Sequence, residues 1–147
     1  MASYRHLARS CVMQAIFALE FNNGDSEAIL KSLLNEFAPQ LTDIEFAEET
    51  LAGITKNKDA ILGIIQKYAP DWPVDKIARI DRAILEIGIF EIVYSDEIPS
   101  VVAINEAVEL AKHFGDENSP KFVNGVLSSV MKAYNKKSEK TGTKNRR

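Results

Sequence analysis

The sequence contains few of the residues that most often carry chemistry. Its 147 residues include one tryptophan, one cysteine, Cys11, and two histidines, His6 and His113. A single cysteine excludes an intramolecular disulfide and is typical of a reducing compartment such as the cytoplasm. The two histidines fall on different predicted helices, with no cluster of cysteines or histidines around them, which argues against a zinc site.

Motifs of the common enzyme classes are missing as well. The chain has no glycine-rich phosphate loop, no G-x-S-x-G segment and no H-E-x-x-H segment. Cys11 falls on the apolar face of the first predicted helix, where a cysteine more often fills a core than acts as a nucleophile. We therefore expect no catalytic activity, no metal and no cofactor.

Long hydrophobic runs are also missing. Apolar stretches such as residues 61–65 are far too short to span a bilayer. The first eleven residues include basic side chains but lack the apolar region of a secretory signal. We expect no membrane contact and a cytoplasmic location.

Charge is distributed unevenly along the chain. The first 19 residues hold Arg5 and Arg9 and no acid, and residues 132–147 hold seven basic residues and one acid. Residues 20–131 carry nine basic and twenty acidic side chains, a net charge of −11. An acidic body with basic ends can bind a polyanion and a basic protein on different surfaces. The simpler alternative is an acidic domain with a solvated tail.

Apolar residues recur with helical spacing, and no segment alternates as a half-buried strand does. We expect seven helices, at about residues 4–21, 26–37, from 42, 59–68, 74–94, 100–114 and from 119. The fold class is therefore all-α, a compact bundle of about seven helices. A single domain of residues 1–135 is expected, in two packed subdomains of about 1–70 and 71–135. The basic residues 136–147 lack apolar spacing, so we expect a disordered tail.

Capping residues and prolines mark the helix boundaries. The Asn-Asn-Gly segment at 22–24 should end the first helix, and T-x-x-E at 42–45 is a capping-box pattern that opens the third. Two prolines within residues 70–73 forbid a continuous helix and mark the boundary between the subdomains. The Ser-Pro pair at 119–120 predicts a serine N-cap followed by proline in the first helical position.

Two groups of residues have the composition of a phosphate-binding surface. Arg5 and Arg9 are four residues apart on one line of the first helix, near its positive end, where like charge is unfavourable. An arginine pair can clamp phosphates and stack on bases. Lys121 adds charge at the start of the last helix, where backbone N–H groups favour anions. Phe122 beside it is either a stacking platform for a base or a core residue.

Three further residues are unusual inside helices. Asn105 and Asn124 have low helix propensity. We interpret either as a buried hydrogen-bonding bridge between the last two helices. Gly125 costs about 1 kcal/mol relative to alanine in a helix interior, so we expect it to permit a close helix contact.

Two blocks of the sequence closely resemble the signature of the NusB family. They are AINEAVELAK at 103–112, followed by FG at 114–115, and KFVNGVL at 121–127. Similarity extends to residues 83–87, 90–91 and 98–99, and to the ARSC segment at 8–11 with QA at 14–15. The resemblance covers most of residues 4–131.

This resemblance implies an all-helical protein of two subdomains without enzymatic activity. The family binds a single-stranded leader RNA element, boxA, together with NusE, a ribosomal protein. That complex joins RNA polymerase in the processive antitermination of ribosomal RNA transcription. Arg5 and Arg9 match the arginine-rich N-terminal segment of the family, but His6 and Leu7 stand where further arginines can occur.

The resemblance also implies the residues that contact RNA. Lys121 and Phe122 match the RNA-facing end of the family's last helix. Asn118 stands where many members carry an acid, and the loss of a negative charge there should favour RNA. Tyr68 is a second candidate stacking surface.

A NusE-facing surface is expected on the second half of the chain. The candidates are Asp81, at a position that is usually acidic in the family, together with Arg82, Glu86 and Glu91. A solvated face of the fifth helix is the alternative interpretation. The acidic body of the chain favours a basic partner, because complementary charge accelerates encounter.

Two other functions remain open at this point. A NusB-like module also occurs in ribosomal RNA methyltransferases, although no cofactor-binding domain follows before the chain ends at residue 147. The chain could instead be an interaction module that self-associates through its first helix, and a homodimer is left open.

Overall fold

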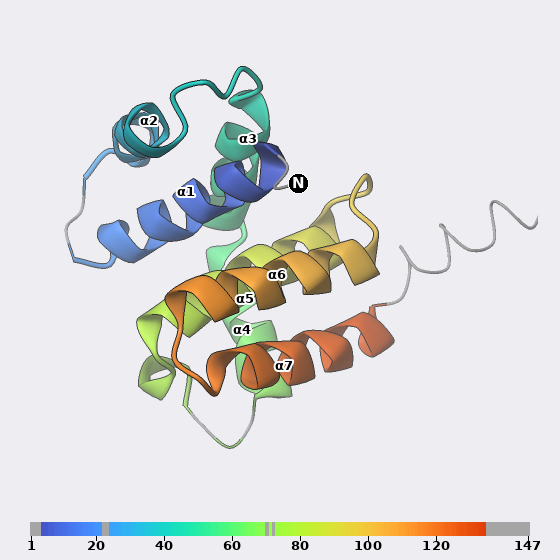
Figure 1. The fold of residues 1–147 in the computed structure, drawn as a ribbon. Helices are drawn as coiled ribbons and strands as arrows, with labels where there is room; N and C mark the ends of the chain where they lie inside the picture. Colours follow the sequence, from blue (N-terminus) through green and yellow to red (C-terminus); the bar gives the residue numbers. More distant parts are fainter. Residues whose placement is uncertain (1–3, 22–23, 70, 72, 135–147) are drawn as a thin grey trace, which may run out of the picture. The chain divides into compact units, whose positions relative to one another are not determined.

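The computed structural model describes residues 4–21, 24–69, 71 and 73–134. The described residues form seven α-helices and no strand, which confirms the all-α fold (Figure 1). The helices are α1 (Tyr4–Leu19), α2 (Ser26–Phe37), α3 (Glu45–Lys56), α4 (Lys58–Tyr68), α5 (Arg79–Ile89), α6 (Ser100–Phe114) and α7 (Ser119–Ala133). A 3-10 turn, η1 (Val74–Lys76), precedes α5, and a π-helical turn, η2 (Phe90–Tyr94), follows it.

Some expectations lie outside the described residues. They concern the tail at 136–147, the asparagines of the 22–24 segment, and Pro70 and Trp72 in the proline segment. The described residues form two compact units, one that ends at Asn57 and another that begins at Lys58. This division precedes the proline segment because α4 packs against α5 and α7. The prolines therefore follow the first helix of the second unit.

The first unit consists of α1, α2 and α3, with α1 packed against both of the others. Cys11 is buried on α1, and its Sγ lies 3.8 Å from the carbonyl oxygen of Leu33 on α2. Burial raises the pKa of this thiol, so Cys11 has the environment of a core residue. Asp25 caps α2, because its carboxylate accepts a hydrogen bond from the Glu27 N–H at 3.1 Å.

The predicted capping box of the third helix is wrong. Helix α3 begins at Glu45 itself, and its N-cap residue is Ile44, which has no side-chain acceptor. Thr42 therefore lies before the cap rather than in it. The predicted apolar face is confirmed, since Phe46, Leu51 and Ile54 are all buried.

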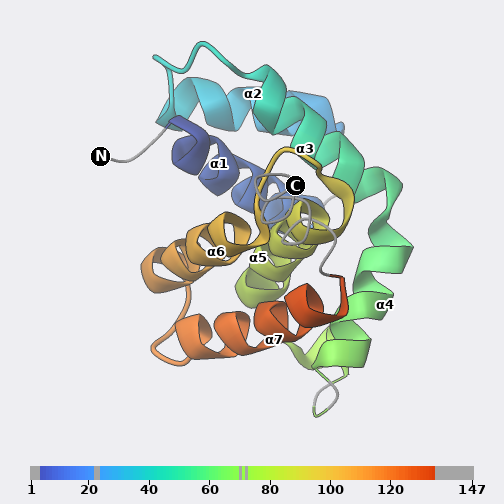
Figure 2. The same cartoon turned by 90° about the vertical axis from the view of Figure 1, so that its right-hand side faces the viewer.

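In the second unit, α5 contacts α4, α6 and α7, and Figure 2 shows these helices around it. Residues 83–89 are buried without exception, which confirms that this helix is central to the unit. It is shorter than expected, because Ile77 and Ala78 have extended backbone with ψ near 137° and 136°. Ile77 is nevertheless buried. The apolar pattern before Arg79 therefore indicates which side chains are buried, but it does not indicate a helix.

The close contact between helices occurs at Gly88 and not at Gly125. A Cβ atom on Gly88 would lie 2.6 Å from a methyl carbon of Leu127, so α5 and α7 approach closely there. A Cβ atom on Gly125 would have no neighbour within 4 Å. The expected bridges at Asn105 and Asn124 are also wrong, because both side chains are exposed to solvent.

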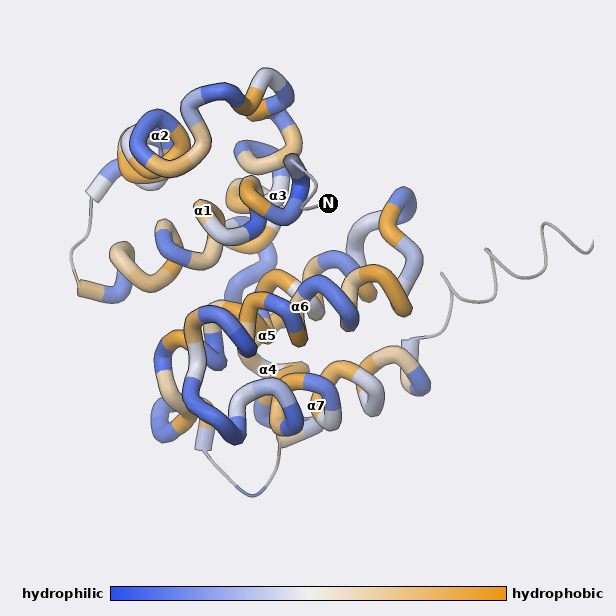
Figure 3. Tube along the Cα trace, in the orientation of Figure 1, coloured by the Kyte–Doolittle hydropathy of each residue, from blue (hydrophilic) through white to orange (hydrophobic). Residues whose placement is uncertain are grey.

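Hydropathy alternates along each helix as amphipathic packing requires (Figure 3). Over the described part of the chain, we find no helix with the length and apolar content needed to cross a membrane.

Candidate nucleic-acid interface

In the first unit, the two predicted arginines meet at one aromatic ring. The Cζ atom of Arg5 lies 4.4 Å from the centre of the Phe46 ring, and that of Arg9 lies 5.1 Å from the same centre. Both distances are within the range of a cation–π interaction. Phe46 comes from α3 and is 8% exposed, so the ring reaches the arginines from the core of the unit.

The two arginines differ in exposure. Arg9 is 3% exposed, whereas Arg5 is half-buried. Met13, one further turn along the same line of α1, is fully buried. Burial along this row of side chains therefore increases from Arg5 to Met13. Of the two arginines, Arg5 is the one that is accessible to solvent. No sequence pattern links Phe46 to the arginines, because it lies 37 residues after Arg9 in the chain.

In the second unit, the start of α7 is organised by Asp116. Its carboxylate accepts hydrogen bonds from the Asn118 N–H at 2.8 Å and the Ser119 hydroxyl at 3.3 Å. The Ser119 oxygen in turn accepts from the Asp116 N–H at 3.0 Å. Asn118 is the N-cap position and Ser119 the first helical residue, so the helix starts one residue earlier than predicted. Lys121 lies exposed in this first turn.

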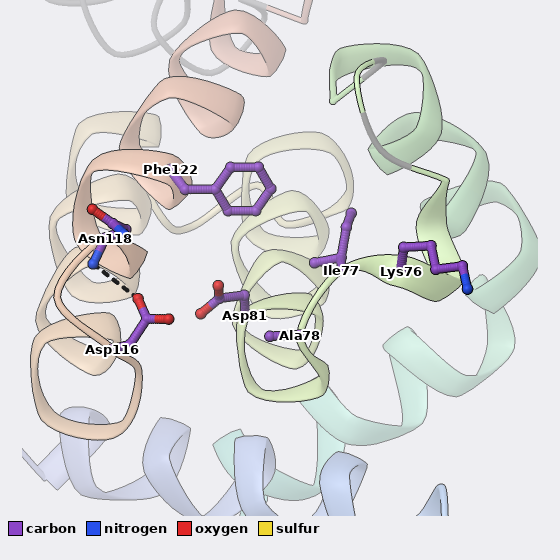
Figure 4. Close-up of a pocket in the computed structure, with 7 residues that line it drawn as sticks. All are labelled: Lys76, Ile77, Ala78, Asp81, Asp116, Asn118 and Phe122. Carbon is purple, nitrogen blue, oxygen red and sulfur yellow. Dashed lines mark hydrogen bonds between the residues drawn. The ribbon is translucent and has the colours of Figure 1, made fainter.

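A pocket of about 230 Å³ lies beside the start of α7 (Figure 4). Its lining comes from α7, the loop before it, the segment that leads into α5, and the first turn of α5: Lys76, Ile77, Ala78, Asp81, Asp116, Asn118 and Phe122. The ring of Phe122 points towards Ile77, and the carboxylate of Asp81 points towards Asp116 and Asn118. Asn118 and Phe122, predicted to contact RNA, thus share a pocket with Asp81, predicted to contact a protein.

Asp81 has the most unusual electrostatic environment in this pocket. It is 9% exposed, and its Oδ1 atom has no hydrogen-bond partner. Burial raises the pKa of this carboxyl, a hydrogen bond with the Ser119 side chain lowers it, and the negative charge of Asp116 raises it again. The net direction is upward. The pocket therefore offers a desolvated acceptor next to the aromatic face of Phe122.

Tyr68 is half-buried at the end of α4. The ammonium nitrogen of Lys67 lies 5.5 Å from the centre of its ring. An aromatic ring can stack on a base, and a cation beside the ring can bind the phosphate of the same nucleotide. Lys67 was not predicted, although its position next to Tyr68 in the sequence is a signal for this contact.

The other predicted partner residues are less accessible than expected. Glu86 is fully buried and forms an ion pair with Lys58 at 2.6 Å, and Glu91 is 1% exposed. Arg82 is half-buried and donates a hydrogen bond to the Val74 carbonyl oxygen at 3.1 Å. The expectation that Glu86 and Glu91 lie on an open face of the helix is wrong, since both are enclosed in the structure.

The described residues contain no group of three or more histidine, cysteine, aspartate or glutamate side chains placed to hold a metal ion. Arginine and lysine supply charge, and Phe122 and Tyr68 supply aromatic faces.

The model of the NusB family matches residues 6–132 of this chain. The transcription antitermination protein NusB of Dehalococcoides mccartyi is 42% identical over 133 residues, which cover 90% of this chain and 93% of the relative. The protein of the same name from Bacillus pumilus is 41% identical over 126 residues, with coverage of 86% and 93%.

Solved structures show the same similarity. The structure of NusB from T. maritima has a TM-score of 0.82 and 34% identity, and the match covers 95% of this chain and 98% of that one. A crystal structure of the antitermination factors NusB and NusE in complex with dsRNA contains a chain with a TM-score of 0.81 and 26% identity. There the match covers 91% of this chain and 100% of the other.

Proposed function

Because this chain belongs to the NusB family, we propose that it is a transcription antitermination factor. In this proposal it binds single-stranded boxA-type RNA together with the ribosomal protein NusE, and the complex joins RNA polymerase during ribosomal RNA transcription. The observation that carries the proposal is the continuous 42% identity with an antitermination protein over 133 residues. A chain of similar fold was solved in the complex of NusB and NusE with dsRNA, which supports NusE and RNA as the two partners, while the preference for a single strand is part of the proposal.

The proposed RNA contacts include residues of each unit. Arg5 in the first unit and Lys121 in the second have the exposure and the charge to bind phosphates. Phe122 and Tyr68 are half-buried rings against which unpaired bases can stack. Asn118 is exposed beside Phe122, and its neutral side chain adds no negative charge to those of Asp116 and Glu117. Single-stranded RNA presents unstacked bases to such surfaces, whereas a duplex hides them.

NusE is proposed to bind the second unit through charge. The body of the chain has a net charge of −11 between residues 20 and 131, which suits a basic ribosomal protein. Asp81 and Arg82 remain the candidate contacts, because Asp81 lines the pocket beside α7 and Arg82 is half-buried. Glu86 and Glu91 would act through the packing of the unit, because a buried side chain cannot touch a partner directly.

The proposed activity is binding alone, without catalysis, and its place is the cytoplasm, where transcription of ribosomal RNA occurs in bacteria. The lack of nucleophile and metal-site motifs in the sequence supports this part of the proposal.

The proposal is tested by measuring the affinity of a labelled boxA-type RNA for the chain, with and without NusE. We expect NusE to tighten RNA binding, because two proteins that contact the same RNA share the entropic cost of immobilising it. A scrambled single strand and a duplex of the same sequence serve as controls. Equal affinity for all three RNAs, or no effect of NusE, would contradict the proposal. Tightest binding of the duplex would retain RNA binding but refute the preference for single strands.

A further inference from the structure

Two guanidinium groups share a single ring in the first unit. The ring belongs to Phe46, which is buried on α3, and its centre lies 4.4 Å from Arg5 Cζ and 5.1 Å from Arg9 Cζ. Two cations that close to one point lie within about 10 Å of each other, roughly one Debye length in physiological salt, so they repel. The negative face of an aromatic ring attracts both cations and offsets that repulsion.

The two arginines differ in how far they are exposed to solvent. Arg9 is almost fully buried and Arg5 is half-buried, so the ring is covered by an inner and an outer guanidinium. A guanidinium that lies over a ring uses its face for that contact, and its N–H donors stay in its own plane. Donors in that plane are the groups that bind phosphate oxygens. The ring contact therefore limits the positions that the two guanidinium groups and their donors can take.

We propose that Phe46 is a positioning residue for RNA binding, whose ring holds Arg5 and Arg9 in the arrangement that Arg5 needs to contact a phosphate. The proposal rests on the proposed RNA-binding function and extends it to a residue with no charge and no expected RNA contact. Its physical content is preorganisation. A long, rotatable side chain held in its bound orientation loses less conformational entropy when RNA binds.

The test replaces the ring while it keeps an apolar side chain. Phe46→Leu removes the π face, Phe46→Tyr retains it, and Leu51→Val loosens packing elsewhere on the same helix, where Leu51 is 3% exposed. RNA affinity is measured at several salt concentrations with the full chain and NusE, and Arg5→Gln is included to report the function itself. If the leucine variant does not fold, Phe46→Met serves in its place, because methionine also lacks a π face.

We expect Phe46→Leu to weaken RNA binding about fivefold, the size expected when one long side chain must be ordered on binding, and to flatten its salt dependence. Phe46→Tyr and Leu51→Val should bind close to wild type, even if the latter is less stable. Without RNA, NMR should show that the δ-methylene protons of both arginines lose their ring-current shift in the leucine variant and keep it in the tyrosine variant.

The outcomes separate the inference from the function. If Arg5→Gln weakens binding while Phe46→Leu binds as wild type does, the inference is wrong and the function stands. If Leu51→Val weakens binding as much as Phe46→Leu, the ring has only a structural role and the inference is again wrong. If the wild-type chain with NusE binds no RNA, the proposed function fails and the inference fails with it.

Discussion

Asp81→Asn should stabilise the protein at neutral pH. The wild-type carboxyl is 9% exposed, and its Oδ1 atom has no hydrogen-bond partner. An unsatisfied buried polar atom costs about 1–3 kcal/mol, and the nearby charge of Asp116 adds to the penalty on the ionised form. Asparagine has no charge to desolvate, and its oxygen can still accept a hydrogen bond. Allowing for the remaining exposure, we expect a gain of about 1–2 kcal/mol, which raises the midpoint of thermal unfolding by about 2–8 °C in a chain of this length.

The pH dependence of this gain follows from the raised pKa. A carboxyl whose pKa is higher in the folded state binds its proton more tightly there, so wild-type stability falls as the pH rises through that pKa. The advantage of Asp81→Asn should therefore be full at neutral pH and shrink as the pH falls towards about 4, near the pKa of an unfolded aspartate. Thermal unfolding followed by circular dichroism between pH 4 and 8 measures it.

The control for this series is Asp75→Asn, which changes the net charge equally at an exposed position. It should move the free energy of unfolding by less than about 0.5 kcal/mol. A loss of stability in Asp81→Asn at pH 7, or a gain that is independent of pH, would refute the argument that burial penalises this carboxylate.

Two further predictions concern α7 and its contacts. Gly88→Ala should lower the free energy of unfolding by about 1 kcal/mol, because the new methyl group would meet the buried Leu127 side chain. Gly125→Ala should instead raise it by about 1 kcal/mol, since that position has open space and alanine favours a helix. Urea denaturation of the two variants checks this, and changes of the same sign would contradict the packing described. Asn118→Asp should weaken RNA affinity severalfold without lowering stability, since an acid is favourable at an N-cap but repels phosphate. Equal RNA affinity for both residues would remove Asn118 from the interface.

The helices were predictable from sequence wherever a local pattern determines them. The serine and proline that begin α7 and the capping aspartate of α2 act over a few residues, so spacing alone locates those helices to within one or two positions. The region before Arg79 was not predictable in this way. An apolar side chain with helical spacing indicates burial, and Ile77 is buried from extended backbone.

The environment of the site residues was less predictable because it depends on distant parts of the chain. Glu86 belongs to a segment that reads as a charged helix face, yet it pairs with Lys58, 28 residues earlier. Phe46 likewise reads as an ordinary core residue of α3, and only the fold brings its ring to Arg5 and Arg9. Residue identity suggested which side chains could bind RNA, but the partners that orient them come from tertiary structure.

The most direct test of the account is the salt dependence of RNA binding by the chain in complex with NusE. We predict that the logarithm of the affinity falls linearly with the logarithm of the salt concentration. Arg5→Gln and Lys121→Gln should each reduce the magnitude of the slope by about 0.7, the value for one phosphate contact to a single strand. A slope that neither substitution changes, or an affinity independent of salt, would contradict the claim that these two residues bind the RNA backbone.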